Sequence, residues 1–120
     1  MTTKIALAFL LAAFAAAALG DMTDDEQTHV LRAKHFFIDR LKDPDSAQFR
    51  NLVVRKIFKD NGTVLYNVCG EINAKNSFGG YVGFRPFYFS GDWGEVLGEN
   101  NIEAFKLIYT EVVCTTPLPE

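Results

Sequence analysis

Apolar side chains between residues 24 and 42 recur at the three- and four-residue spacing of one face of an α-helix. The members of this series are Val30, Leu31, Phe37, Ile38 and Leu41, with basic residues mostly between them. Thr23 followed three residues later by Glu26 is the pattern of a capping box, and Pro44 disfavours helical backbone at the residue before it. The pattern therefore predicts a helix from about residue 24 to residue 42.

Beyond this segment the pattern changes to runs of β-branched and aromatic residues, which favour strands. The runs cover residues 49–59, 64–73 and 81–90, with a short fourth run at 95–97 and a single helical turn expected after Pro44. Asn61-Gly62 separates the first two runs and is the strongest short signal for a hairpin. We therefore expect an antiparallel sheet of three or four strands.

Residues 101–114 fit two structures. Ile102, Phe105, Ile108 or Tyr109, and Val112 lie on one helical face, and an asparagine cap precedes them. Alternation from Phe105 to Tyr109 and the β-branched run up to Val113 fit a strand instead. We favour the helix, so the predicted fold class is α+β: an N-terminal helix, three or four antiparallel strands and a C-terminal helix.

Residues 1–20 have the three parts of a secretory signal peptide. Lys4 is followed by an apolar run over residues 5–19, and Ala18 and Gly20 provide small side chains before a cut ahead of Asp21. A retained membrane anchor is the alternative, but the run is short for a hydrocarbon core of about 30 Å. We expect a periplasmic or secreted protein whose residues 21–120 form a single α+β domain.

Two cysteines fall within that domain. An oxidising compartment would join Cys69 and Cys114, and closing a loop of 46 residues should contribute on the order of 4 kcal/mol. C-x-x-C spacing is absent, which argues against a catalytic thiol pair. We expect a structural disulfide.

The net charge of the chain argues against nucleic acid as a partner. The formal net charge is −3, and loss of Lys4 with residues 1–20 leaves 11 basic and 15 acidic residues, a net charge of −4. A nucleic-acid binder would normally be basic. Residues 32–59 hold eight basic and three acidic residues, whereas the chain from residue 92 onward holds six acidic residues and one lysine. The two blocks are either solvated or mutually paired faces, or a polarised surface that steers a charged partner.

Catalytic and metal-binding patterns are not evident. His29 and His35 are six residues apart, roughly 240° around a helix, and so point to different sides. The glycines of residues 79–83 lack the Lys-Ser sequel of a P-loop, and no serine lies in a G-x-S-x-G elbow. We expect no catalytic residue, no metal and no cofactor.

The most distinctive stretch, residues 69–89, combines aromatic residues with glycines and amides, and the aromatic residues continue to Trp93. Glycines in a strand usually mark a bulge or a close backbone approach, and exposed aromatics beside amides resemble a binding hot spot. The stretch is either a register device in an aromatic hairpin or a partner-contacting edge. The candidate binding surface is Asn73, Lys75, Asn76, Phe78, Tyr81, Phe84 and Trp93.

Strand parity places Glu71 on the same side as Cys69, facing a helical layer. A carboxylate there needs a partner, because an unpaired buried charge is costly. Arg85 on the following strand is the first choice and Lys75 the second. We predict a buried Glu71–Arg85 ion pair, either structural or part of a polar pocket.

Two blocks carry a resemblance. LKDPDSAQFRN at residues 41–51 and CGEINAKNSFGGYVGF at residues 69–84 are similar to motifs of small exported proteins of Gram-negative bacteria and their phages. The similarity covers most of residues 24–114 and implies a compartment, but no mechanism. Many members are lipoproteins, whereas this chain has no cysteine near the expected cut.

These observations favour an exported, non-enzymatic binding module with a protein or envelope-component partner, such as an inhibitor or exclusion factor acting on an envelope or phage component. The alternative is a small envelope hydrolase that cleaves cell-wall material through Glu71 and Asp92. That reading needs the two carboxylates about 5–10 Å apart across one cleft. A third reading, a structural envelope component, predicts an exposed apolar patch and self-association.

Overall fold

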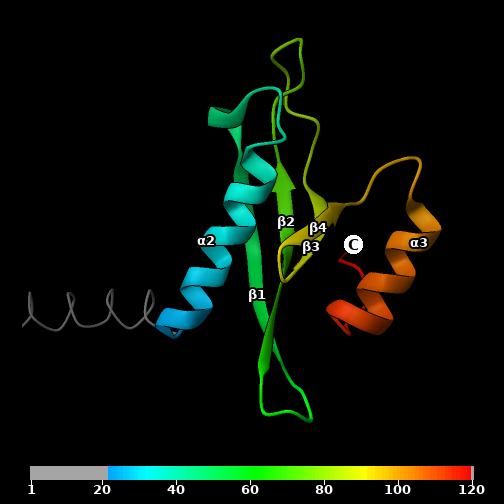
Figure 1. Ribbon diagram of the computed structural model, residues 1–120. Coiled ribbons are helices and arrows are strands. Elements are labelled where there is room, and N and C mark those ends of the chain that lie inside the picture. Colours follow the sequence, from blue (N-terminus) through cyan, green and yellow to red (C-terminus); the bar gives the residue numbers. More distant parts are fainter. Residues whose placement is uncertain (1–21, 120) are drawn as a thin grey trace, which may run out of the picture.

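The computed structural model describes residues 22–119 and shows an α+β fold with one disulfide (Figure 1). The expected signal peptide lies outside the described residues. The elements are helix α2 (Asp24–Ile38), a 3-10 turn η1 (Pro44–Ser46), strands β1 (Gln48–Phe58), β2 (Val64–Asn73), β3 (Arg85–Ser90) and β4 (Trp93–Val96), helix α3 (Ile102–Leu107) and a π-helix η2 (Ile108–Val113).

Helix α2 begins as its sequence predicts and ends earlier. The Thr23 hydroxyl oxygen accepts a hydrogen bond from the Glu26 amide at 3.2 Å, and three acidic residues occupy the first turn, where they face the positive end of the helix dipole. After Ile38 the amides of Arg40 and Leu41 each donate to the carbonyl three residues earlier instead of four. The amide of Leu41, for example, donates to the carbonyl of Ile38 at 3.1 Å. The expected extension to residue 42 is therefore wrong.

The buried face of α2 is formed by Val30, Ala33 and Phe37. Their spacing of three and four residues places them on one side of the helix. Leu31 was expected in this stripe but is 55% exposed, because it lies about 100° around the helix from Val30. Small Ala33 allows the helix to approach the sheet closely.

The four strands form an antiparallel meander in the order β1-β2-β3-β4. The β1–β2 hairpin turns at Asn61-Gly62, as predicted, where the Asn61 side chain accepts from the Thr63 amide at 3.1 Å. Strand β3 begins at Arg85 rather than at residue 81, because residues 74–84 leave the sheet as a long loop and pair only through a bridge between Lys75 and Tyr81.

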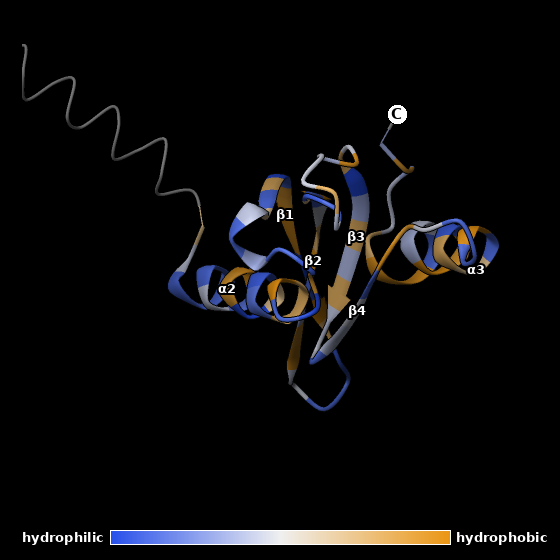
Figure 2. Cartoon of the chain, turned by 90° about the horizontal axis from the view of Figure 1, so that it is seen from above, coloured by the Kyte–Doolittle hydropathy of each residue, from blue (hydrophilic) through white to orange (hydrophobic). Residues whose placement is uncertain are grey.

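The sheet separates two apolar clusters, with α2 on one face and the C-terminal helical segment on the other (Figure 2). Alternate residues of a strand point to opposite faces, so β2 and β3 contribute to both clusters. On the α2 side the buried residues are Val30, Ala33, Phe37, Val68, Ile72, Phe87 and Phe89. On the other side they are Cys69, Tyr88, Phe105, Tyr109, Val113 and Cys114.

The C-terminal segment is helical, so the strand alternative is wrong. Its buried residues are Phe105, Tyr109 and Val113, each four residues after the last. Ile102 and Val112, expected on the buried face, are 41% and 60% exposed. The face is displaced because η2 has wide turns, in which the Cys114 amide donates five residues back to the Tyr109 carbonyl at 2.9 Å.

The disulfide between Cys69 and Cys114 is present, with 6.1 Å between the two Cα atoms. It joins the middle of β2 to the residue after η2. The side chain of Asn67, two residues earlier on the same face of β2, donates to the Val113 carbonyl at 3.2 Å. One covalent bond and one buried hydrogen bond therefore attach the end of the chain to the sheet.

Replacing both cysteines, Cys69→Ala with Cys114→Ala, should lower the free energy of unfolding by about 4 kcal/mol, because the unfolded chain regains the freedom of a long loop. Denaturant unfolding monitored by circular dichroism measures this loss. The reduced wild-type chain is the matched control and should unfold at the same midpoint as the double variant. Equal midpoints for the oxidised wild type and the variant would contradict the expectation.

Candidate functional site

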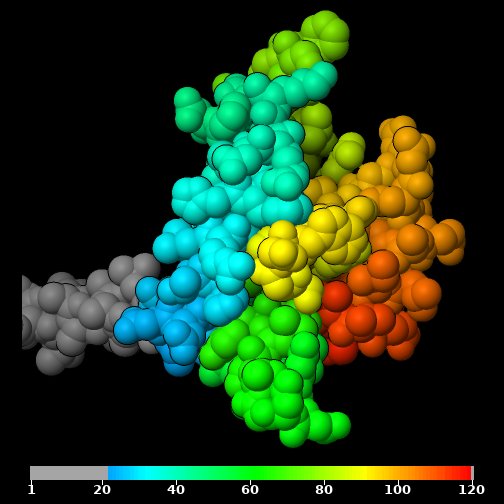
Figure 3. All heavy atoms as spheres, in the orientation of Figure 1, coloured from blue at the N-terminus to red at the C-terminus, as the bar shows by residue number. Residues whose placement is uncertain are grey.

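Residues 74–84, here called the loop arm, connect β2 to β3 and project beyond the end of the sheet (Figure 1, Figure 3). The loop arm contains five residues of the predicted binding surface: Lys75, Asn76, Phe78, Tyr81 and Phe84. A sixth, Asn73, is the last residue of β2. Six of the seven residues of the predicted binding surface therefore lie in one contiguous segment, residues 73–84.

The tip of the loop arm is closed by hydrogen bonds around Asn76. The Asn76 amide donates to the Gly80 carbonyl at 2.9 Å, and the Gly79 amide donates to the Asn76 carbonyl at 3.0 Å. The Asn76 side-chain oxygen accepts from the amides of Phe78 at 2.9 Å and Gly80 at 3.2 Å. This side chain replaces a backbone partner, as asparagine does in tight turns, and restrains the tip.

Two glycines allow the backbone of the loop arm to turn. Gly79 has φ of 82° and Gly83 has φ of 96°, a region that L-residues other than asparagine and aspartate rarely adopt. A Cβ atom at either position would meet no atom within 4 Å, so backbone conformation and not lack of space requires glycine. These glycines set the shape of the tip and do not mark a phosphate site.

Three further hydrogen bonds anchor the base of the loop arm. The Lys75 amide donates to the Ser46 hydroxyl at 2.9 Å, and the Lys42 ammonium donates to the Ser77 hydroxyl at 3.1 Å. The Asn73 side chain accepts from the Gly83 amide at 2.9 Å and is buried. Asn73 is therefore an anchor within the predicted surface and is not available for contact.

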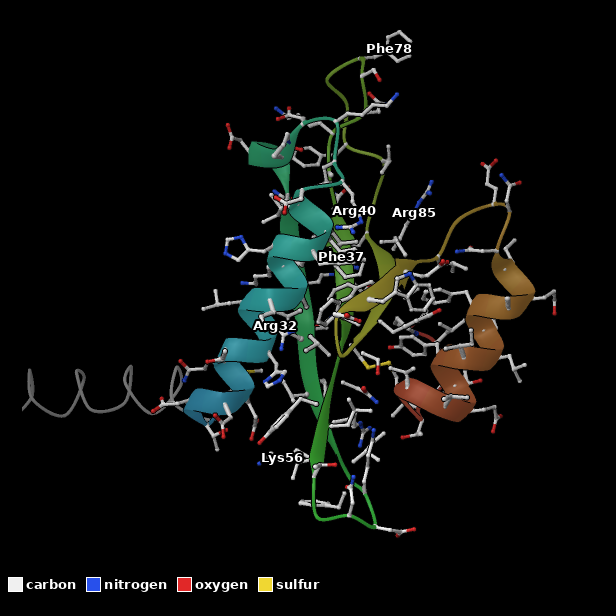
Figure 4. All side chains as sticks on the ribbon, in the orientation of Figure 1. Arg32, Phe37, Arg40, Lys56, Phe78 and Arg85 are labelled. Carbon is white, nitrogen blue, oxygen red and sulfur yellow. A yellow bond between two sulfur atoms is a disulfide. The ribbon has the colours of Figure 1, made fainter. Side chains whose placement is uncertain are left out.

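Three large apolar side chains of the loop arm are exposed, beside the polar residues Asn76 and Ser77. Phe78 is 97% exposed and points outward from the tip (Figure 4). Tyr81 and Val82 are 46% and 49% exposed, and the Lys75 ammonium lies 5.5 Å from the centre of the Tyr81 ring. Phe84, in contrast, is half-buried, and the Arg50 guanidinium lies 3.8 Å from the centre of its ring.

Trp93 does not belong to this surface. It pairs with Ser90 at the end of β3 far from Arg85, whereas the loop arm enters β3 at Arg85. Its ring is half-exposed and meets the Tyr88 ring edge-on, with 5.8 Å between ring centres. Trp93 therefore supports the C-terminal side of the sheet.

Glu71 is buried as predicted, but its partners differ from the prediction. The Arg50 guanidinium donates to both carboxylate oxygens, at 3.1 and 3.3 Å, and the Asn51 amide group donates at 2.7 Å. Arg85 is the strand partner of Ile72, so its side chain points to the opposite face of the sheet. The Glu71–Arg85 pair was therefore wrong, and the second choice, Lys75, lies instead against Tyr81.

The surroundings of Glu71 favour its ionised form. The hydrogen bonds from Arg50 hold the pKa of Glu71 below its usual value of 4.5, against the opposing effect of burial, and Asn51 adds to the lowering. A carboxylate held ionised in this way is a poor general acid at neutral pH. Its contacts are those of a structural ion pair.

Asp92, the second carboxylate of the hydrolase hypothesis, lies in the turn after β3. Glu71 is opposite Pro86 and Asn67 is opposite Ser90, so the turn is at least four residues further along the sheet. Four residues of a strand span roughly 13 Å. This exceeds the separation that glycoside cleavage needs, so the placement does not favour the hydrolase.

The sequence reasoning overlooked Arg50 and Asn51 as partners of Glu71, Ser46 as an anchor of the loop arm, and Val82 as part of its exposed surface. A signal existed for the first two. Counting back from a three-residue turn, Asp60-Asn61-Gly62, in which Lys59 pairs with Thr63, places Glu71 opposite residue 51, and a bulge between Arg50 and Val53 brings the neighbouring arginine opposite as well. No local signal connected Ser46 to a loop 29 residues later.

Comparison with protein-family models, with curated proteins and with solved structures found no match. Within residues 22–119, no group of three or more His, Cys, Asp or Glu residues is placed to hold a metal ion. In the same part of the chain, each helix is too short or too polar to cross a bilayer.

Replacing Glu71 by glutamine should lower the free energy of unfolding by about 2 kcal/mol at pH 7, because the hydrogen bonds to a charged acceptor are weakened. The pKa of Glu71 is lowered by folding, so this contribution is complete above pH 4.5 and is lost as the pH falls through the folded value. Denaturant unfolding from pH 7 to pH 3 should show the gap between wild type and variant closing below about pH 4.5.

Glu103→Gln, at an exposed position on α3, is the matched control and should change the free energy of unfolding little at any pH. A gap between wild type and Glu71→Gln that stays constant down to pH 3 would contradict the ion pair with Arg50.

Proposed function

We propose that this chain is an exported, non-enzymatic binding module whose loop arm enters a recess on a protein partner. The observation that carries the proposal is the 97% exposure of Phe78 on a tip closed by hydrogen bonds. The role is that of an inhibitor or exclusion factor, and the partner is a component of the cell envelope or of a phage.

Exposure of Phe78 is informative because its ring contributes almost nothing to the core of its own chain. Transfer of a phenylalanine side chain from water to an apolar site is worth about 1.5–3 kcal/mol, which is available when a partner covers it. The restrained backbone adds to this gain, since a loop already held in its bound shape loses little entropy on binding. An exposed aromatic on a rigid projection is therefore suited to a concave partner.

The side chains of the loop arm indicate the chemical character of the recess on the partner. Phe78, Tyr81 and Val82 offer an apolar surface. The segment that anchors the loop arm carries both signs of charge, because Lys42 precedes Asp43 in the chain and Asp45 lies in the η1 turn, so no single sign of charge prevails there. We infer a partner recess with an apolar centre and a polar rim, recognised mainly by shape and apolar contact.

Export supports the choice of partner. Residues 1–20 have the composition of a signal peptide, and the Cys69–Cys114 disulfide suits an oxidising compartment. The resemblance of residues 41–51 and 69–84 to small exported proteins points to the same place. A periplasmic or secreted location brings the loop arm into contact with envelope and phage proteins.

Phe78→Ala should reduce capture of the partner by residues 21–120, with at least about a tenfold rise in Kd, because truncation removes the central apolar contact. Affinity purification from periplasmic extract and phage lysate identifies the partner, and titration with the purified partner gives the Kd. Tyr81→Ala should have a smaller effect.

Phe58→Ala is the matched control, since Phe58 is a phenylalanine 75% exposed in β1, beside the Asn61-Gly62 hairpin turn. Its Kd should equal that of the wild type. Equal affinity of the Phe78→Ala variant and the wild type would rule out the loop arm as the binding surface, and self-capture of the chain would favour the structural reading.

The variant Asn76→Ala tests the rigidity of the loop-arm tip separately from the apolar contact that Phe78 makes with the partner. Loss of the side-chain acceptor should speed hydrogen exchange at the amides of Phe78 and Gly80 and weaken binding by a factor of a few, because the tip must then be ordered on binding. Nuclear magnetic resonance measures the exchange. Faster exchange with unchanged affinity would show that rigidity of the tip does not matter.

A further inference from the structure

A cavity of about 390 Å³ lies on the α2 face of the sheet, away from the tip of the loop arm. It is formed where the end of α2 meets the last residues of β2, the segment entering β3, and β4. Its apolar wall is formed by Phe37, Leu41, Ile72 and Val96. Phe37 and Ile72 belong to the buried cluster under α2, so residues of the core form part of the cavity wall.

Two arginines, Arg40 and Arg85, line the same cavity. Figure 4 shows that they come from different elements, Arg40 from the turn after α2 and Arg85 from the start of β3. In the part of the chain that the structure describes, the ion pairs are Arg50–Glu71 and Lys56–Glu26, so neither arginine has an acidic partner.

Arg40 is held in place by its neighbour. Its guanidinium donates to the Phe36 carbonyl at 2.6 Å and lies 3.5 Å from the centre of the Phe36 ring. A guanidinium has five N–H donors in a planar fork, so most of them stay free for an anion. An oriented fork next to an apolar wall is pre-organised for an oxyanion.

One acidic residue, Glu95, also lines the cavity. Glu95 is the strand partner of Tyr88, which belongs to the cluster on the C-terminal side of the sheet. Its carboxylate accepts a hydrogen bond from the Asn101 side chain at 2.9 Å, and strand parity places it on the face of the sheet opposite to that of Arg85. The charge presented to a ligand in the cavity is therefore positive.

We propose that this cavity binds a small single-chain amphiphile, with its acyl chain against Phe37, Ile72 and Val96 and its anionic oxygen headgroup at Arg40 and Arg85. Carboxylate and phosphate share the oxygen geometry that guanidinium recognises. The volume is near the low end for ligand pockets, which suits one chain of about ten carbon atoms rather than a two-chain lipid. The cavity shares Ala74 and Val82 with the loop arm but lies away from Phe78 at the tip, so this inference does not rest on the proposed protein partner.

The test is a titration of isotope-labelled residues 21–120 with sodium decanoate below its critical micelle concentration, followed by amide chemical shifts. Shifts should be confined to residues that line the cavity, and decyl phosphate tests the second headgroup. Decanol, which lacks the charge, and acetate, which lacks the chain, should both bind at least about tenfold more weakly.

The double variant Arg40→Gln/Arg85→Gln should weaken decanoate binding at least about tenfold, since both charge-assisted contacts are lost. The control Arg32→Gln/Lys59→Gln removes two exposed positive charges elsewhere and should bind as the wild type does. Both pairs are exposed, so both variants should fold. Unchanged binding by the first variant, equal binding of decanol, or tighter binding of an apolar tetrapeptide would overturn the proposal.

Discussion

The architecture depends on strand β2, whose two faces are attached to the rest of the chain by different kinds of interaction. One face is apolar and packs beneath α2 through Val68 and Ile72. On the other face four successive inward side chains, from Asn67 to Asn73, each make a specific bond to another part of the chain. Because side chains alternate along a strand, a slip of one residue would exchange the two faces and break every one of these bonds at once. The specific bonds run from Asn67 to Val113, Cys69 to Cys114, Glu71 to Arg50 and Asn73 to Gly83.

Much of the fold was predictable because its signals are local. The Asn61-Gly62 turn and the β-branched run after it give β2 its bounds, and the capping residues give α2 its start. The sequence predictions failed where tertiary packing decides which side of a helix is buried. Leu31 fits an apolar stripe in sequence, yet the position of the sheet selects Ala33. The wide turns of η2 displace its buried face by one residue, which periodicity calculated for a regular α-helix cannot anticipate.

The candidate site was predictable in part. Glycines and aromatics indicated that residues 78–84 are unusual, but residues 81–84 were predicted as strand and belong to the loop arm instead. Its projection from the sheet depends on Ser46 and Lys42, which precede it by about 30 residues and carry no signal of that contact. Trp93 was grouped with the loop because it is near in sequence, but a hairpin carries it to the other end of the sheet. The arginine-lined cavity is formed by four separate segments, so no local sequence pattern could indicate it.

The division of the interior by the sheet also bears on cooperativity. The two apolar clusters share strands but no helical layer, so each helical layer is a candidate for sub-global opening on its own. The C-terminal segment is two short helical pieces, too short to persist once detached. Apolar packing, the hydrogen bond from Asn67 to Val113 and the cystine attach it to the sheet, and of these three the cystine is the covalent one. The oxidation state of the cystine therefore affects how much of the chain unfolds as a unit. Reduction would free one layer for fast exchange while the layer under α2, with its cavity, stays protected.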